Sequence, residues 1–240
     1  MDLLISVMVT EEVAATVQGG ADIVDVKNPS EGALGASFPH IIRHVRRETP
    51  ARLPVSAALG DVPNLPGTIS LAALGAATCG VQYVKVGLLG PSHAAEAIYL
   101  LRQVCRAVRE TSHQPMVIAT GYADAHKVNA LLPSELPAVT AKAGAHGCLL
   151  DTVFKGGGNL FSYLDDSQLT QFVHQCRQFH LLSALAGSLT ARDIPRIQEI
   201  GPDIIGFRTA ACQGDRVNGR IDAGLVRRLK DLVAASESPS

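Results

Sequence analysis

The stretch GGADIVDVKNP at residues 19–29 decides the fold. Paired glycines before an aspartate suit the end of a helix, because glycine accepts the left-handed conformation that terminates helices. The run IVDVK that follows is apolar and β-branched, which favours a short buried strand. Similar turns recur as CGVQ, AGAH and IGPD at residues 79–82, 143–146 and 200–203. These turns predict that a helix end and a strand start are repeated along the chain.

Eight short apolar runs predict eight strands, separated by segments with helical spacing. The predicted strands are residues 3–9, 23–27, 54–59, 83–86, 116–120, 148–151, 182–186 and 204–207. Strands that alternate with helices form parallel βαβ units, and eight units in 240 residues match a closed (β/α)8 barrel. A doubly wound open sheet is the alternative, but it usually needs fewer strands. We therefore predict an α/β protein, a single (β/α)8 TIM barrel over residues 1–233 with a polar tail at 234–240.

The composition argues against several classes of protein. The chain has 21 Lys and Arg against 22 Asp and Glu, which gives a net charge of −1. This balance lacks the basic footprint of a nucleic-acid binder, so we expect no nucleic-acid partner. No apolar run reaches the about 18 residues of a membrane span, so we expect no membrane partner. The 5 cysteines are scattered without a C-x-x-C pair, which favours reduced, buried thiols in a cytoplasmic protein.

Charged residues on the predicted strands indicate carbonyl chemistry. Asp25 and Lys27 lie two residues apart on one strand and so share a face. Lys85 lies near the end of the fourth strand, and Asp151 ends the sixth, with Lys155 in the glycine-rich loop that follows. A lone buried ammonium is costly, and active sites of this fold lie at the carboxyl ends of the strands. A desolvated lysine beside other cations can form a Schiff base, although a phosphate-binding lysine would show the same residue type.

A second signal follows the last two predicted strands. Gly187 and Ser188 come after the seventh strand, and Arg208 and Thr209 come after the eighth. In (β/α)8 enzymes these loops often bind phosphate through backbone N–H groups, and an arginine can add a bidentate contact. The alternative interpretation is that Ser188 only caps the next helix. A phosphorylated aldehyde would account for both signals.

Other polar residues are less informative. His40 and His44 have metal-ligand spacing, but no third ligand follows, so we predict no metal site. Three histidines precede predicted strands and are expected to be structural: His113, His146 and His180. Three residues follow predicted strands and are expected to contact substrate: Asp61, Tyr122 and Asp124.

Seven segments carry a resemblance to a known family. They are GGADIVDVKNPSEGALGASFP (19–39), LGDVPNLPGTISLAALGAA (59–77), YVKVGL (83–88), ATGYADA (119–125), LLDTVFKGG (149–157), ALAGSL (184–189) and FRTAAC (207–212). In this order and register, from about residue 2 to residue 230, the chain resembles the (5-formylfuran-3-yl)methyl phosphate synthase family. That family is also called 4-(hydroxymethyl)-2-furancarboxaldehyde-phosphate synthase.

The resemblance implies a class I aldolase-like lyase on a (β/α)8 barrel. Such an enzyme condenses two molecules of glyceraldehyde 3-phosphate into a furan aldehyde phosphate, releasing phosphate and water, in methanofuran biosynthesis. It implies that Lys27 forms the Schiff base and that Lys85 accepts or donates protons. Asp25, Asp151 and Lys155 would be supporting acid, base and phosphate-orienting groups. It implies a triose phosphate substrate and no cofactor.

Our hypothesis is that Lys27 forms an imine with one triose phosphate and that the enamine attacks the aldehyde of the second. Two alternatives stay open: another Schiff-base aldolase or isomerase of sugar phosphates, and a non-catalytic phosphometabolite-binding barrel. The lysine pair on the strands argues against the second, because a phosphate binder gains nothing from an amine with a lowered pKa. Barrels of this kind often assemble, and the apolar segment 68–77 could bury a face, so we expect a homo-oligomer.

Overall fold

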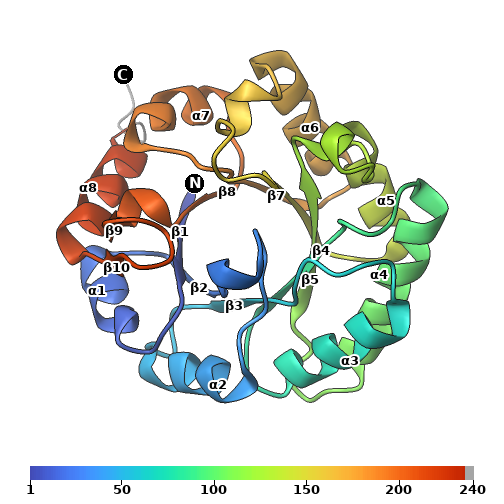
Figure 1. The fold of residues 1–240 in the computed structure, drawn as a ribbon, viewed down its shortest axis with the longest axis horizontal. Helices are drawn as coiled ribbons and strands as arrows, with labels where there is room; N and C mark the ends of the chain where they lie inside the picture. The colour runs from blue at the N-terminus through green and yellow to red at the C-terminus, as the bar shows by residue number, and fades with distance from the viewer. Residues whose placement is uncertain (236–240) are drawn as a thin grey trace.

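Eight parallel strands close into a barrel that is surrounded by helices in the computed structural model, which describes residues 1–235 (Figure 1). The barrel strands are β1 Asp2–Val7, β2 Ile23–Val26, β3 Val55–Ala58, β4 Tyr83–Gly87, β5 Met116–Tyr122, β6 Gly147–Asp151, β7 Leu182–Leu185 and β8 Ile204–Phe207. The α-helices are α1 Glu12–Gly19, α2 Pro39–Glu48, α3 Pro66–Ala77, α4 Ala94–Arg109, α5 Leu136–Ala143, α6 Asp166–Gln178, α7 Ile194–Ile200 and α8 Ala223–Ala234. The predicted (β/α)8 barrel is confirmed. Residues 236–240 of the predicted tail lie outside the described residues.

The strand bounds agree with the predicted runs to within a few residues. The first strand was expected at residues 3–9 but ends at Val7, and α1 begins at Glu12. A short hairpin of β9 (Cys212–Gln213) and β10 (Arg220–Ile221) lies between β8 and α8 and was not predicted. Its strands have only two residues each, too few to give a periodic pattern.

Alternation along the strands separates two apolar layers. Leu3 and Ile5 pack outward against the helices in the larger core cluster. Leu4 between them belongs to the smaller cluster inside the barrel, with Ile23 and Leu149. The same alternation sends the polar residues of β2 and β4 inward, so the barrel interior is where a buried charge can meet a partner.

The helix-to-strand turns repeat one device at the amino-terminal end of the barrel. The predicted glycine turns are confirmed: Gly20, Gly144 and Gly201 end helices in the left-handed conformation, with φ of +90°, +77° and +71°. In all four predicted turns, including the one at residues 79–82, the side chain of the last turn residue accepts a backbone N–H from the preceding strand. We call these four hydrogen bonds the turn clamps: Leu3 N to Asp22, Val55 N to Gln82, Val117 N to His146 and Ser183 N to Asp203, at 2.8, 2.8, 3.0 and 2.8 Å.

One of the three histidines that were expected to be structural takes part in a turn clamp. His146 Nδ1 accepts a backbone N–H, so its expected structural role is confirmed. His113 and His180 lie in the turns before β5 and β7. The 5 cysteines are all buried and free, as expected from their apolar surroundings.

The carboxyl end of the barrel is covered by long loops. The loop after β2 includes a 3-10 helix, η1 (Pro29–Glu31), and crosses the centre of the barrel mouth in Figure 1. It buries Ala33 and Leu34 among the residues of the inner cluster. Thus a segment without strand or helix pattern forms the roof of the barrel interior.

The surface gives two further observations. Within residues 1–235, no helix has the length and apolarity that crossing a membrane requires. The outward face of α3 carries Leu71 with its side chain 72% exposed, and the expected self-association stays a prediction.

Candidate active site

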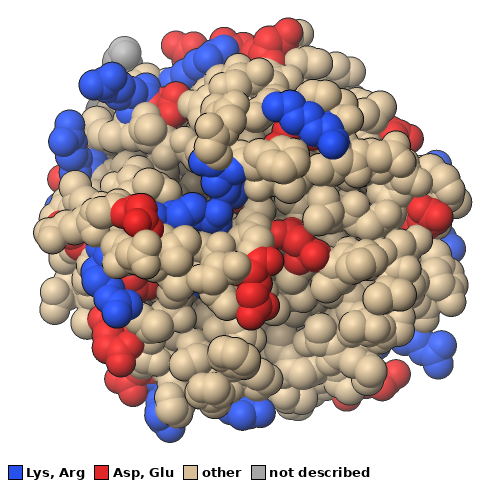
Figure 2. All heavy atoms as spheres, in the orientation of Figure 1, with Lys and Arg blue, Asp and Glu red and all other residues tan. Residues whose placement is uncertain are grey.

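The predicted site residues meet in one pocket at the carboxyl end of the barrel. Eight of them line it: Lys27, Lys85, Asp151, Lys155, Gly187, Ser188, Arg208 and Thr209. The ninth, Asp25, lies below the pocket floor and is bonded to Lys85. Lys and Arg side chains gather in a hollow near the centre of this face, on the side of the β9–β10 hairpin (Figure 2).

The Lys85–Asp25 pair occupies the barrel interior. Lys85 Nζ lies 2.7 Å from Asp25 Oδ2, and the side chains are 4% and 0% exposed. Ser6 Oγ donates a second hydrogen bond to the same oxygen at 2.8 Å. The other oxygen, Oδ1, is buried without a hydrogen-bond partner among the described residues. A buried carboxylate with one unbonded oxygen can still accept a proton, which suits a proton relay.

Lys27 follows β2 and is the amine best suited to nucleophilic attack. Its backbone N–H bonds to Val7 O at 3.1 Å, which continues the pairing of β2 with β1. Burial, together with the charges of Lys85 and Lys155, lowers the pKa of Lys27 to about 8 against the opposing effect of Asp151. At pH 7 about a tenth of such an amine is neutral, far more than for an ordinary lysine.

Lys27 differs from the other two lysines in its bonding. Within residues 1–235, Lys27 Nζ makes no hydrogen bond or ion pair, whereas Lys85 and Lys155 are each paired with an aspartate. A neutral, unpaired amine that lines a pocket is the form that attacks a carbonyl carbon.

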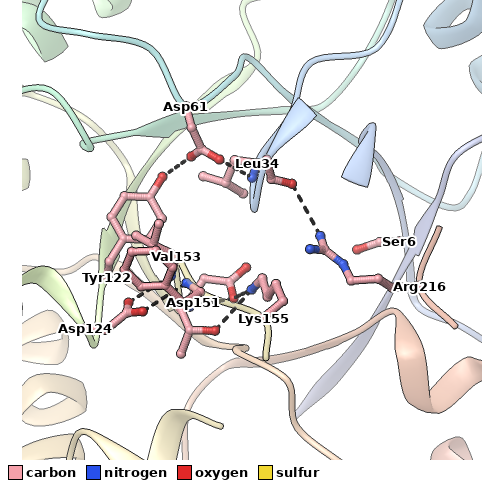
Figure 3. Close-up of polar contacts among 12 residues, drawn as sticks. Ser6, Leu34, Asp61, Tyr122, Asp124, Asp151, Val153, Lys155 and Arg216 are labelled. Carbon is pink, nitrogen blue, oxygen red and sulfur yellow. Dashed lines mark hydrogen bonds and ion pairs between the residues drawn. The ribbon is translucent and has the colours of Figure 1, made fainter. Parts of the chain in front are cut away.

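The Asp151–Lys155 pair (Figure 3) lines the same pocket as Lys27 and interacts with it electrostatically. Lys155 Nζ bonds to Asp151 Oδ1, which also accepts Thr152 N at 2.7 Å. Burial opposes ionisation of Asp151, but Lys155, Lys27 and these hydrogen bonds lower its pKa to about 2. Asp151 is therefore an anion near neutral pH.

Asp61, Tyr122 and Asp124 support the loops and do not line this pocket. Tyr122 OH donates to Asp61 Oδ1, and Asp61 Oδ2 accepts Leu34 N at 2.8 Å, which anchors the loop after β2 (Figure 3). Burial, together with Asp61, raises the pKa of Tyr122 well above its usual value. Asp124 accepts the backbone N–H groups of residues 153–154 at 2.8 and 3.0 Å and so positions the loop of Lys155.

The loop after β7 has the features of an anion site. Gly187 and Ser188 both have positive φ, +105° and +54°, and a Cβ on Gly187 would lie 3.1 Å from Thr152 Cγ2. Among the described residues, no acceptor receives the N–H groups of residues 187–189, which all line the pocket. Ser188 is not the helix cap: Thr190 caps the 3-10 helix η5 (Ala191–Asp193) and accepts Arg192 N. The capping interpretation of Ser188 is therefore wrong.

Arg208 makes its bidentate contact with a protein carboxylate. Its Nη1 and Nη2 lie 2.7 and 3.0 Å from the two oxygens of Glu12, with side chains 4% and 2% exposed. Nη1 also donates to Ser6 O at 3.0 Å. Glu12 therefore occupies the two N–H groups that were expected to bind phosphate. Sequence reasoning missed Glu12, because it lies 196 residues away.

Arg216 is the pocket residue that sequence reasoning overlooked. It lies in the β9–β10 hairpin and lines the pocket with Lys155. No predicted strand or motif surrounds it in the sequence, so only the folded hairpin reveals that it lines the pocket at the barrel mouth.

Solved structures of low sequence identity share the fold. The 3-hexulose-6-phosphate synthase from Salmonella typhimurium matches 98% of this chain and 99% of its own, with a TM-score of 0.69 and 15% identity. Phosphoribosyl anthranilate isomerase from Thermus thermophilus matches 99% and 100%, with a TM-score of 0.65 and 16% identity. At such identities the likeness supports the barrel alone.

Sequence relatives are much closer. The (5-formylfuran-3-yl)methyl phosphate synthase of Methanothermobacter thermautotrophicus is 51% identical over 234 residues, which are 97% of this chain and 99% of the relative. The protein of the same name from Methanocaldococcus jannaschii is 48% identical over 97% and 99% of the two chains. A family model described as 4-HFC-P synthase matches residues 3–230. Lys27, Lys85, Asp151 and Lys155 line one pocket, and Asp25 is bonded to Lys85. Together with this geometry, the matches establish that the chain belongs to the 4-HFC-P synthase family.

Proposed function

We propose that this protein condenses two molecules of glyceraldehyde 3-phosphate into (5-formylfuran-3-yl)methyl phosphate through a Schiff base on Lys27. The name of the relatives supports the product. The observation that carries the mechanism is an unpaired, buried lysine with a pKa of about 8 beside two paired lysines. One phosphate and two molecules of water account for the remaining atoms of the two trioses.

Lys27 begins the reaction as a neutral amine. Its Nζ attacks the carbonyl carbon of one triose phosphate, and the carbinolamine then loses water to give the imine. Loss of a proton from the carbon beside the imine gives an enamine, which forms the carbon–carbon bond to the second triose. Elimination of phosphate and water, with closure of the ring by a hydroxyl that displaces the Lys27 amine from the former imine carbon, completes the furan and regenerates the enzyme.

Two acid–base pairs serve the proton transfers. Lys85 lines the pocket and can protonate the departing hydroxyl while Asp25, at 2.7 Å, stabilises its charge and accepts a proton in turn. Asp151 is ionised and lies beside Lys155, so it can remove a proton from the bound triose. The free N–H groups of residues 187–189 are suited to the phosphate of the triose held at Lys27.

Borohydride trapping tests the proposal. Glyceraldehyde 3-phosphate and borohydride should attach a triose to the peptide that contains Lys27, as mass spectrometry would show. Lys27→Ala should abolish this adduct and lower turnover by on the order of 10⁴-fold or more, because nucleophile removal costs that much in other covalent enzymes. The matched control is Lys142→Ala, an exposed lysine in α5, which should leave both unchanged.

Product analysis separates the proposal from its alternatives. A furan aldehyde phosphate formed from the triose alone supports the proposed synthase. An adduct at Lys27 with a sugar phosphate as product would instead indicate another Schiff-base aldolase. Trapping that survives Lys27→Ala unchanged would remove Lys27 from the reaction.

A further inference from the structure

The β9–β10 hairpin is built to hold one arginine over the pocket. Asp215 Oδ1 accepts the backbone N–H groups of Val217 and Asn218, both at 2.7 Å, and Gly219 N bonds back to Asp215 O at 3.0 Å. These bonds fix a tight loop around Arg216 without using its side chain. The tip of the hairpin is therefore an ordered platform.

A buried ion pair anchors this platform to the barrel. Arg208, held by Glu12, donates its Nε to Arg216 O at 3.1 Å and its Nη2 to Gly219 O at 3.4 Å. Glu12 also accepts Met8 N at 2.8 Å, so the same carboxylate ties the end of β1 to the hairpin. Arg208 thus positions the backbone of Arg216.

The guanidinium of Arg216 has most of its donors available. An arginine offers five N–H donors. Within residues 1–235, Arg216 uses one, from Nη2 to Gly32 O at 3.3 Å. Figure 3 shows its side chain reaching into the pocket from the side opposite Tyr122. Burial lowers the pKa of Arg216, while Asp151 and Asp61 favour its charge, so it stays a cation near neutral pH.

The proposed reaction needs two anion sites in one pocket. The N–H groups of residues 187–189 can hold one phosphate, but Arg208, the other cation of that region, is held by Glu12. Lys85 and Lys155 are paired with aspartates, and Lys27 must be neutral to react. Arg216 is the remaining cation among the residues that line the pocket.

We propose that Arg216 is the binding residue for the phosphate of the second triose, the one that the Lys27 enamine attacks. This inference rests on the proposed function. A planar guanidinium with free N–H groups can grip a phosphate with two parallel hydrogen bonds. Its bond to Gly32 O would then link the bound triose to the loop that covers the barrel mouth.

The test compares a partial reaction with the whole one. Arg216→Ala should leave borohydride trapping of the first triose at Lys27 within about twofold of wild type. It should lower product formation by about 10- to 100-fold at low substrate, the range expected for a lost charge-assisted hydrogen bond. Arg216→Lys should recover only part, because it restores charge without the fork. Arg220→Ala is the matched control, an exposed arginine of the same hairpin outside the pocket.

Each outcome decides the assignment. Lost product with intact trapping supports it, and unchanged product formation in Arg216→Ala overturns it. Loss of trapping together with product would place Arg216 at the first triose and also overturns it. A wild-type enzyme that neither traps nor condenses the triose contradicts the proposed function itself.

Titration with inorganic phosphate tests the site independently of turnover. Wild-type protein should bind two phosphate ions, and Arg216→Ala should bind one, as calorimetry would measure. Equal stoichiometry in the two proteins overturns the assignment, whatever reaction the enzyme performs.

Discussion

Two Lys–Asp ion pairs lie toward opposite ends of the barrel and differ in their exposure to solvent. Near the amino-terminal end, Lys230 Nζ lies 2.7 Å from Asp22 Oδ2, and the side chains are 30% and 29% exposed. Toward the carboxyl end, Lys85 and Asp25 are also 2.7 Å apart but are 4% and 0% exposed. Burying an ion pair costs about several kcal/mol of desolvation free energy per charge. A pair that keeps contact with solvent avoids most of this cost.

The comparison shows how the two ends use polar groups. Asp22 accepts the N–H of Leu3 as well as Lys230, so its charge serves the backbone of a turn. Asp25 bonds only side chains, Ser6 and Lys85, and keeps one oxygen unbonded among the described residues. The carboxylate at the amino-terminal end thus stabilises a turn, whereas the carboxylate inside the barrel pairs with a lysine of the pocket.

The largest expected effect comes from breaking the buried pair. Lys85→Met should destabilise the protein by about 3–5 kcal/mol, because Asp25 loses its counter-charge in the barrel interior. Turnover should fall by about 10²- to 10⁴-fold with the loss of the proton donor. Lys230→Met, the matched change at the other end, should cost about 1 kcal/mol or less and leave turnover unchanged. Denaturant unfolding and steady-state rates measure both, and equal destabilisation would contradict the comparison.

The next largest effect concerns a turn clamp. Asp203→Ala should destabilise the protein by about 1–3 kcal/mol, because the N–H and hydroxyl of Ser183 both lose their acceptor. Turnover per folded molecule should not change, since Asp203 lies at the end away from the pocket. Asp203→Asn keeps an acceptor and should recover much of the stability. A change in turnover with no change in stability would mean that the amino-terminal end takes part in catalysis.

A smaller effect concerns the pH dependence of imine formation. The trapping rate should fall about tenfold per pH unit below pH 8, because protonation of Lys27, with a pKa of about 8, removes the nucleophile. Lys155→Ala removes a positive charge that lowers this pKa, so the acid limb should move to higher pH. The rate of borohydride trapping between pH 6 and 10 checks both. A limb that moves to lower pH would contradict the assigned electrostatics.

The smallest effect is a pH-dependent loss of stability at the third turn clamp. Burial, with Arg109, lowers the pKa of His146 below 6.5, so the unfolded chain binds its proton first as pH falls. Stability should therefore be complete above pH 6.5 and decline below it until the folded histidine also titrates. Gln82 performs the same task in another turn, so His146→Gln should keep the hydrogen bond and flatten this decline. An unchanged pH profile in that variant would assign the decline to other groups.

The fold could be predicted from local patterns because a barrel strand and its turn are short and repetitive. The sequence IVDVK after a glycine turn predicts its own strand, and the two-residue spacing of Asp25 and Lys27 follows from the geometry of that strand. The pocket could be predicted for the same reason, since parallel strands place their carboxyl ends together.

The rest depends on contacts between distant segments. The position of Arg208 after the eighth strand led us to expect a bidentate contact with phosphate, but Glu12 of α1 occupies its guanidinium. Arg216 reaches the pocket only because a two-stranded hairpin folds over the barrel mouth. Leu34 lies in a segment without strand or helix periodicity. Even so, its backbone N–H bonds to Asp61 and its side chain is buried in the inner cluster. No periodicity encodes such pairings.

The four turn clamps also lie in four successive parts of the chain, residues 3–22, 55–82, 117–146 and 183–203. Each clamp joins two consecutive strands, and none of the four connects a residue before the loop at residues 110–115 to one after it. A cut in that loop would leave two clamps in each half. Lys27 and Lys85 would remain in the first half, and Asp151 and Lys155 in the second. Two halves made as separate chains should therefore be inactive alone and regain activity on meeting, as a split enzyme that reports its own reassembly.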